Sequence, residues 1–267
     1  MKRPGQMARA EIAASRGELR YTGHAMNNNP EAPALPRDPL PWCLGPRAFG
    51  GLLKAHRASW LPLFMLCALV IAEPDLDRMQ SLALSRYGQP TANLVAEWRQ
   101  SIAGMQGMTD RDKLKAVNNF FNGKIKWVED PVAWGQKDYW ATPLETMGNR
   151  RGDCEDFAIA KYATLLLAGV PVDKLRITYV KAAVGGVHAA HMVLAYYETP
   201  GSDPLILDNL IYDIWPGSKR TDLKPVYGFN SQGLWVGGAA APATRDPGAK
   251  LSRWRDLLQR AANEGLG

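Results

Sequence analysis

The stretch GDCED, residues 152–156, places one thiol among three carboxylates. The thiolate is the nucleophilic form of cysteine, and neighbouring negative charges oppose its formation. Cys154 also falls at the start of a strong helical pattern, where unpaired N–H groups and partial positive charge favour a thiolate and can bind an oxyanion. Cys154 is therefore a candidate nucleophile, and an inert buried thiol is the alternative interpretation.

A nucleophilic cysteine needs a base, and His188 and His191 are the histidines that follow residue 72. His191 opens an apolar strand pattern that would fix the direction of its ring, whereas His188 lies in a glycine-rich turn. Asp208 ends the next apolar strand pattern, where a carboxylate without a partner would be costly. Cys154, His191 and Asp208 can therefore form a triad in which the carboxylate orients the imidazole. A core histidine with satisfied hydrogen bonds and a simple turn at Asp208 are the alternatives.

The elements that must position these residues change character along the chain. Apolar residues recur at helical spacing in the expected helices at residues 76–88, 91–105, 109–127 and 153–169. Shorter β-branched and aromatic segments then predict strands at residues 175–184 and 190–198 and within residues 204–214 and 224–238. Helices followed by an antiparallel sheet predict an α+β domain. An Ala/Pro-rich linker and a short amphipathic helix are expected after it.

Two helix starts carry their own signals. Thr91 follows a proline and is the expected N-cap of the second helix. Thr109 and Asp112 have the spacing of a capping box at the third helix, with Asp in the usual Glu position.

The excess of basic over acidic residues lies almost entirely in residues 1–72. The formal net charge is +6, but residues 1–72 hold nine Lys/Arg against four Asp/Glu, while residues 73–267 hold 23 against 22. No basic stripe remains after residue 72, so nucleic acid is excluded as an expected partner.

The apolar run at residues 60–72 has 13 residues and follows Lys54 and Arg57. This length is short for a membrane span and typical of a signal-peptide core. We expect residues 54–72 to be a signal peptide cleaved after Ala72, which would export the protein; an uncleaved anchor and a core helix are the alternatives. Residues 1–53 are expected to be a poorly structured leader, with the true start near residue 52.

The motif DYWATPLETMGNRRGDCED, followed by HMVL and LDN, resembles the bacterial transglutaminase-like cysteine proteases of the LapG type. The order Cys154, His191, Asp208 matches that family, as do the spacings of 37 and 17 residues between them. The resemblance implies a papain/transglutaminase-like α+β fold, with N-terminal helices and the nucleophile at a helix N-terminus packed on an antiparallel sheet. It implies a protease domain at residues 73–238, with the linker and C-terminal helix at residues 239–267 outside it.

The resemblance also gives the acids beside Cys154 a role. It implies a calcium ion held by Asp153, Glu155 and Asp156, whose hard oxygen atoms suit that ion and whose charge it would cancel. The competing interpretation is that acids at a helix start only cap the helix and complement its dipole. Two interpretations of Trp140, just upstream, are open, as a wall of the substrate cleft and as a packing residue, and no catalytic role is expected for it.

The activity that the resemblance implies is that of a calcium-dependent periplasmic endopeptidase. Its substrate would be a large repeat-rich surface adhesin, cut near its N-terminus at a di-alanine site so that the biofilm disperses. Its regulator would be the periplasmic domain of an inner-membrane receptor that senses cyclic di-GMP. Competing functions are transglutaminase-type acyl transfer, a non-catalytic calcium-binding module and a purely structural exported domain.

Overall fold

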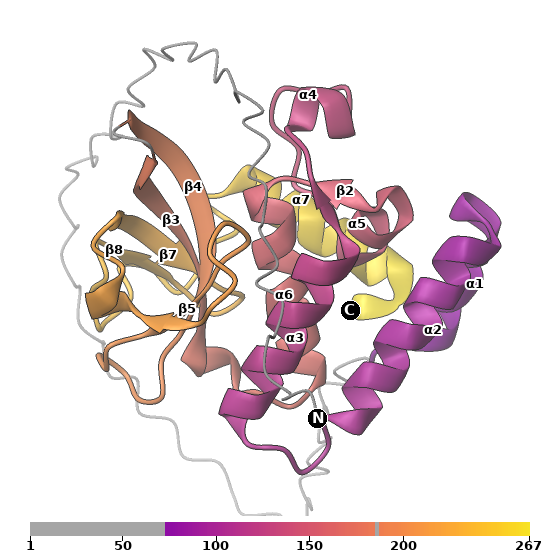
Figure 1. Ribbon diagram of the computed structural model, residues 1–267, viewed down its shortest axis with the longest axis horizontal. Coiled ribbons are helices and arrows are strands. Elements are labelled where there is room, and N and C mark those ends of the chain that lie inside the picture. Colours follow the sequence, from indigo (N-terminus) through magenta and orange to yellow (C-terminus); the bar gives the residue numbers. More distant parts are fainter. Residues whose placement is uncertain (1–72, 185–186) are drawn as a thin grey trace, which may run out of the picture. The chain divides into compact units, whose positions relative to one another are not determined.

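The computed structural model describes residues 73–184 and 187–267 (Figure 1). The described residues all belong to one compact unit. The predicted leader at residues 1–53 and the predicted signal peptide at residues 54–72 lie outside the described residues. Within the described part, no helix is both long enough and apolar enough to span a membrane.

The predicted helices form the first half of the described chain. The longer ones are α1 (Leu76–Tyr87), α2 (Gln89–Gly104), α3 (Asp110–Lys124) and α6 (Cys154–Leu167). Two shorter helices, α4 (Asp130–Ala133) and α5 (Pro143–Asn149), interrupt the predicted loop before α6. Thr109 caps α3 as expected, because its side chain accepts the N–H of Asp112.

The prediction that Thr91 caps the second helix is wrong. Helix α2 already begins at Gln89, with Gly88 as its N-cap and Pro90 in its first turn, and Thr91 is buried inside the helix. Proline is favoured in the first turn of a helix because the N–H groups of that turn have no intrahelical acceptor, so the missing N–H of proline costs no hydrogen bond. The proline therefore marks the start of α2 better than the threonine that follows it.

The second half forms an antiparallel six-stranded sheet in the order β6-β5-β4-β3-β7-β8. Its strands are β3 (Leu175–Val184), β4 (Val187–Tyr196), β5 (Leu205–Leu207), β6 (Trp215–Pro216), β7 (Leu223–Phe229) and β8 (Leu234–Val236). The two long predicted strands are confirmed. The segment 204–214 is paired only at residues 205–207, so Asp208 stands directly beyond the end of β5.

A small separate pairing joins the two ends of the loop region. Strand β1 (Lys126–Trp127) runs parallel to β2 (Arg151–Gly152), and the N–H of Val128 donates to the carbonyl of Gly152 at 2.9 Å. The chain just after α3 is thereby fastened beside the start of α6.

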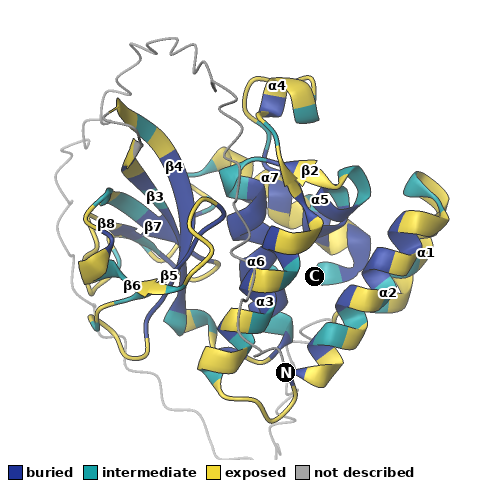
Figure 2. Cartoon of the chain, in the orientation of Figure 1, coloured by how far each residue is buried: buried dark blue, intermediate teal, exposed yellow. Residues whose placement is uncertain are grey.

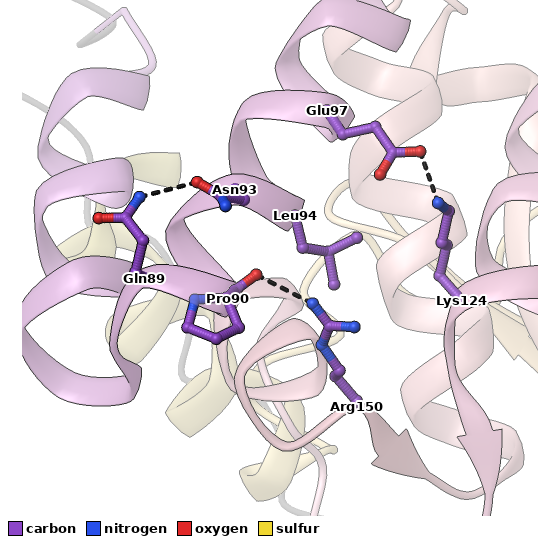
Figure 3. Close-up of a pocket in the computed structure, with 7 residues that line it drawn as sticks. All are labelled: Gln89, Pro90, Asn93, Leu94, Glu97, Lys124 and Arg150. Atoms are coloured by element: carbon purple, nitrogen blue, oxygen red, sulfur yellow. Dashed lines mark hydrogen bonds and ion pairs between the residues drawn. The ribbon is translucent and has the colours of Figure 1, made fainter.

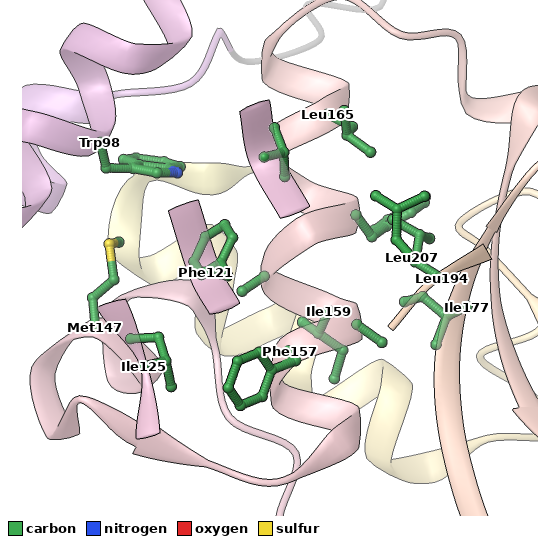
Figure 4. Packing of buried hydrophobic residues seen from close by; sticks show 14 of the residues in the cluster. Trp98, Phe121, Ile125, Met147, Phe157, Ile159, Leu165, Ile177, Leu194 and Leu207 are labelled. Carbon is green, nitrogen blue, oxygen red and sulfur yellow. The ribbon is translucent and has the colours of Figure 1, made fainter. Parts of the chain in front are cut away.

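The core lies where α6 packs on the sheet, with the other helices around it (Figures 1 and 2). Figure 4 shows Phe157 of α6 on the side of the helix nearer Ile125, and the sheet residues Ile177, Leu194 and Leu207 on the other side, all within one buried cluster. These side chains are almost fully buried, and the removal of their apolar surface from water is the main force that holds helix and sheet together. The predicted α+β architecture, with the Cys154 helix packed on an antiparallel sheet, is confirmed.

The C-terminal segment belongs to the same core. Helix α7 (Ser252–Ala261) is the amphipathic helix predicted within residues 239–267, and its Trp254 and Leu257 are 1% and 2% exposed in the cluster that α6 also enters. The last helical turn, Ala262–Leu266, returns to the start of α1, where the N–H of Asp75 donates to Gly265 at 2.8 Å. The resemblance placed residues 239–267 outside the protease domain, because the motifs that carry it end before this segment.

Candidate active site and acidic cluster

Cys154 is the first residue of α6, as expected, and Asp153 is its N-cap. The thiol donates to Oε2 of Glu155 at 3.0 Å. Burial raises the pKa of the Cys154 thiol well above its usual range, Glu155 and Asp153 raise it further, and the backbone N–H of Met192 opposes them. Without a compensating positive charge, burial and the acids beside Cys154 therefore keep the thiol protonated despite its place at a helix N-terminus.

His191 and Asp208 are in direct contact. His191 lies on β4 and is 5% exposed, and its Nε2 is 2.8 Å from Oδ1 of Asp208. An ionised carboxylate only accepts hydrogen bonds, so Nε2 carries the proton and Nδ1 is the nitrogen left to act as a base. Helix α6, which begins with Cys154, packs against β4, the strand that carries His191. His188 also lies on β4 rather than in a turn, but it is exposed.

Asp208 is held by residues that the sequence did not single out. Its carbonyl accepts from Nδ2 of Asn122 at 2.8 Å and from Nζ of Lys161 at 3.1 Å, and its carboxylate accepts from Arg220 at 2.7 Å. Burial opposes ionisation of Asp208, but the contacts of its carboxylate with His191, the N–H of Leu210 and Arg220 outweigh burial and lower its pKa to about 2. A sequence signal for Lys161 does exist, because it is the one charged residue in the otherwise apolar or uncharged run of residues 157–170.

Two further acids join the cluster around Cys154. Asp130 of α4 and Asp138 lie upstream in the chain, and no sequence pattern assigned them a role. Ligand oxygens of Asp130 lie within 4.8 Å of those of Asp153 and Asp156 in one group, and of Asp138 and Glu155 in another. The Oδ1 atoms of Asp130 and Asp153 are buried and have no hydrogen-bond partner among the described residues.

The cluster holds more carboxyl groups than its surroundings can keep ionised. Burial and the neighbouring carboxylates raise the pKa of Asp153 to about 11. Burial also raises the pKa of Asp156 to about 8 and that of Asp130 to about 6, in both cases with a further contribution from Glu155. Among the residues the structure describes, Asp138 has a basic partner, Arg253 at 2.9 Å, and the other four acids have none. An all-oxygen set with free lone pairs fits a hard divalent cation such as calcium.

Asp156 also has a structural role. Its Oδ1 accepts the N–H of Ala141 at 2.8 Å, and its Oδ2 accepts from Nε1 of Trp134 at 2.9 Å and from the N–H of Asp153 at 3.3 Å. A Cβ at Gly152 would lie 2.5 Å from this Oδ2, so only glycine fits there. Of the two roles considered for the acids, Asp156 therefore performs the capping role, whether or not it also contacts a cation.

Trp140 is a packing residue. It is 7% exposed, and its ring stacks on Phe229 with 5.4 Å between ring centroids.

An open pocket of about 360 Å³ lies between α2, α3 and the residue that follows α5 (Figure 3). Its polar groups satisfy one another: Gln89 donates to Asn93 at 2.7 Å, and Lys124 pairs with Glu97 at 2.6 Å. None of the residues predicted to be functional lines it.

The fold and the site together define a papain/transglutaminase type of protein, with a cysteine at the start of a helix that packs on a sheet carrying a His–Asp pair. The family model described as bacterial transglutaminase-like cysteine proteinase BTLCP matches residues 93–226. The chain belongs to this family, and within it to the LapG type.

Solved structures of LapG from Legionella pneumophila support the same assignment. Its calcium-bound form is 40% identical in sequence, with a TM-score of 0.61, and the match covers 70% of this chain and 98% of LapG. The EGTA-treated form has the same identity and coverage, with a TM-score of 0.63. No curated protein matched the chain.

Proposed function

We propose that this protein is a calcium-dependent cysteine endopeptidase whose catalytic triad is Cys154, His191 and Asp208. The observation that carries the proposal is the buried contact of 2.8 Å between His191 and Asp208, with His191 on the strand β4 against which the Cys154 helix packs. Nucleophile, base and orienting acid are the three parts that cysteine proteolysis requires.

The chemistry follows from these positions. Nδ1 of His191 takes the thiol proton as Sγ of Cys154 attacks the scissile carbonyl carbon, and N–H groups at the start of α6 are suited to stabilise the resulting oxyanion. His191 then protonates the leaving amine as the C–N bond breaks, which leaves a thioester on Cys154. Water, deprotonated by His191, attacks this thioester and releases the acid product. Asp208 keeps the imidazole in the required tautomer throughout.

Calcium would be held by Asp130, Asp153 and Glu155, with Asp138 and Asp156 beside them. When bound, the ion would supply the positive charge that the cluster lacks and so lower the pKa of the Cys154 thiol. The unpartnered oxygens of Asp130 and Asp153 support this proposal, and so do the calcium-bound and EGTA-treated forms of the Legionella relative.

The substrate, regulator and location are proposed from the resemblance to the LapG type. The substrate is a large repeat-rich adhesin, cut near its N-terminus at a di-alanine site, and its release disperses the biofilm. The regulator is the periplasmic domain of an inner-membrane receptor for cyclic di-GMP. The protein acts in the periplasm, after export by the signal at residues 54–72.

The test is cleavage of an adhesin fragment that contains the di-alanine site, in calcium and in EGTA. We expect cleavage in calcium, loss in EGTA, and recovery when calcium is restored. Cys154→Ala should abolish cleavage and still bind the fragment. Cleavage that continues in EGTA removes the calcium dependence, and cleavage by Cys154→Ala removes the mechanism. Incorporation of a labelled amine into a glutamine donor without peptide cleavage would indicate a transglutaminase instead.

A further inference from the structure

We propose that Arg220 is a positioning residue that holds the Asp208 carboxylate in the orientation His191 requires, an inference that rests on the proposed triad. The side chain of Asp208 is fully buried, and both of its oxygens are occupied. Oδ1 is 2.8 Å from Nε2 of His191 and accepts the N–H of Leu210 at 3.0 Å. Oδ2 accepts from Nη2 of Arg220 at 2.7 Å.

Arg220 is itself fixed. It is 4% exposed and lies in the segment between β6 and β7, where it forms an ion pair with Asp222. Nε of Arg220 donates to Oδ1 of Asp222 at 2.9 Å, and Nη2 donates to Oδ2 at 2.8 Å. This forked contact sets the plane of the guanidinium, and the same Nη2 then meets Asp208 from a fixed direction.

The contacts of the Asp208 backbone do not restrict the rotation of its carboxylate, and Arg220 can restrict it. Asn122 of α3 and Lys161 of α6 hold its carbonyl, which fixes the peptide but not the rotation of the carboxylate. In the described residues, Arg220 is the hydrogen-bond donor to Oδ2. Without it, Oδ2 would be a buried charged atom with no partner, and the carboxylate would turn away from His191 to find one.

The charges in this arrangement also suit the chemistry. Arg220 alone would cancel the charge of Asp208 and weaken its support for a protonated His191. Asp222 balances Arg220, so Asp208, Arg220 and Asp222 together keep one net negative charge on the side of the imidazole. Arg220 can therefore orient the carboxylate while a net negative charge remains beside His191.

The test uses the full chain in calcium, with Arg220→Met and Arg220→Lys as variants. One readout is kcat and KM on the di-alanine adhesin fragment. The other is the downfield proton NMR signal of Nε2–H of His191 in its bond to Asp208, which needs no substrate. We expect Arg220→Met to lower kcat by about 100-fold, as a small misplacement of a catalytic group does, with KM unchanged. The NMR signal should broaden or disappear.

Arg220→Lys should lose less on both readouts, because lysine keeps the positive charge but cannot fork between two carboxylates. Asp222→Asn should also lower kcat and weaken the His191 signal, but by less than Arg220→Met. Arg220 remains in this variant, and only its ion pair with residue 222 is weakened. If Arg220→Met does not fold, these two variants decide the question by the same criteria.

A matched control is Arg176→Met. Arg176 is 3% exposed, so it is as buried as Arg220, but its guanidinium lies between the rings of Tyr197 and Trp235, 4.2 Å from each centroid. We expect this variant to be less stable and yet, while folded, to keep kcat and the His191 signal. An equal loss of kcat in Arg176→Met and Arg220→Met would reduce Arg220 to a structural role and overturn the proposal.

Unchanged kcat and an unchanged His191 signal in the Arg220 variants would also overturn it. If the wild-type chain does not cleave the fragment but its His191 signal depends on Arg220, the positioning role stands and the proposed function falls. The two proposals can therefore fail separately.

Discussion

Asp156 and Asp130 are both acids of the cluster around Cys154, but their oxygens meet different groups. Both oxygens of Asp156 accept N–H donors, including those of Trp134 and Ala141, so its carboxylate fastens the start of α6 to the preceding loop. Oδ1 of Asp130 is buried without a partner among the described residues. A cation would therefore satisfy Asp130 most directly.

Replacement of Asp130 by asparagine should weaken calcium binding at least about tenfold, because one charged oxygen ligand becomes a neutral amide. Isothermal titration with calcium measures this. Asp173→Asn is the matched control, since Asp173 is exposed and lies in the 3-10 turn Val172–Lys174, and it should bind like the wild type. An Asp130→Asn variant with wild-type affinity would exclude Asp130 from the ion site.

Lys161 makes the folding stability depend on pH. Burial lowers its pKa to about 7 from 10.5, with Asp208 opposing the shift. Below pH 7 the ammonium is charged in both states, and its burial opposes folding in full. Between pH 7 and pH 10.5, Lys161 is protonated in the unfolded chain and neutral in the folded chain, so the free energy of unfolding rises with pH. Above 10.5 the amine is neutral in both states.

Lys161→Met lacks this titration. The unfolding free energy of the wild type minus that of Lys161→Met should therefore increase as pH rises from 7 toward 10.5. Urea unfolding at several pH values measures it, with Lys115→Met, at an exposed site on α3, as the control that should show no such trend. A difference that is flat or falls with pH would mean that Lys161 stays charged in the folded protein.

At the scale of elements, the short β1–β2 pairing builds the acidic cluster. It joins Lys126 to Arg151 and Trp127 to Gly152, so the chain that leaves α3 runs beside the start of α6. Asp130 follows this pairing by three residues on one strand, and Asp153 follows it by one on the other. Acids that are far apart in sequence thereby meet next to Cys154.

Gly152→Ala should disturb this junction, because its Cβ would lie 2.5 Å from Oδ2 of Asp156. We expect a loss of roughly 1–3 kcal/mol in unfolding free energy, as for an overpacked site, together with weaker calcium binding. Chemical denaturation and calcium titration measure the two effects. Gly123→Ala, inside α3 with open space around its Cβ, is the control and should not destabilise. A neutral Gly152→Ala would show that Asp156 can move without consequence.

At the scale of the whole molecule, the C-terminal helix α7 packs into the same hydrophobic core as the first helices. Trp254 of α7 meets Tyr162 of α6 and Phe229 of β7 edge to face, with centroids 5.8 and 5.1 Å apart. Glu264 accepts from Thr142 at 2.5 Å and pairs with Arg86 at 2.8 Å. The last residues of the chain thus tie α1, α5 and the sheet together.

Trp254→Ala should lower the unfolding free energy by about 3–5 kcal/mol, the usual result of removing a large buried aromatic side chain. Trp215→Ala is the control, because Trp215 is 46% exposed and its loss leaves no cavity in the core. Denaturant unfolding followed by circular dichroism compares them. Equal stability of the two variants would mean that α7 can detach from the domain without loss.

Local patterns placed Cys154 at the start of a helix, His191 on a strand and Asp208 at the end of a strand, and the structure has them there. Such positions are marked by residues close in sequence. The periodicity of residues 153–169 and 175–184 likewise predicted α6 and β3 closely. Capping was the weak point, as at Thr91, because one proline changes where a helix begins.

The tertiary structure alone decided which distant groups meet these residues. Arg220, Lys161 and Asn122 reach Asp208 from three separate elements, and no spacing in the sequence records that convergence. Asp130 likewise enters the cluster through a strand pairing. The physical reason is that helical and strand periodicity is local along the chain, whereas the partners of a buried charge are selected by packing between elements far apart in it.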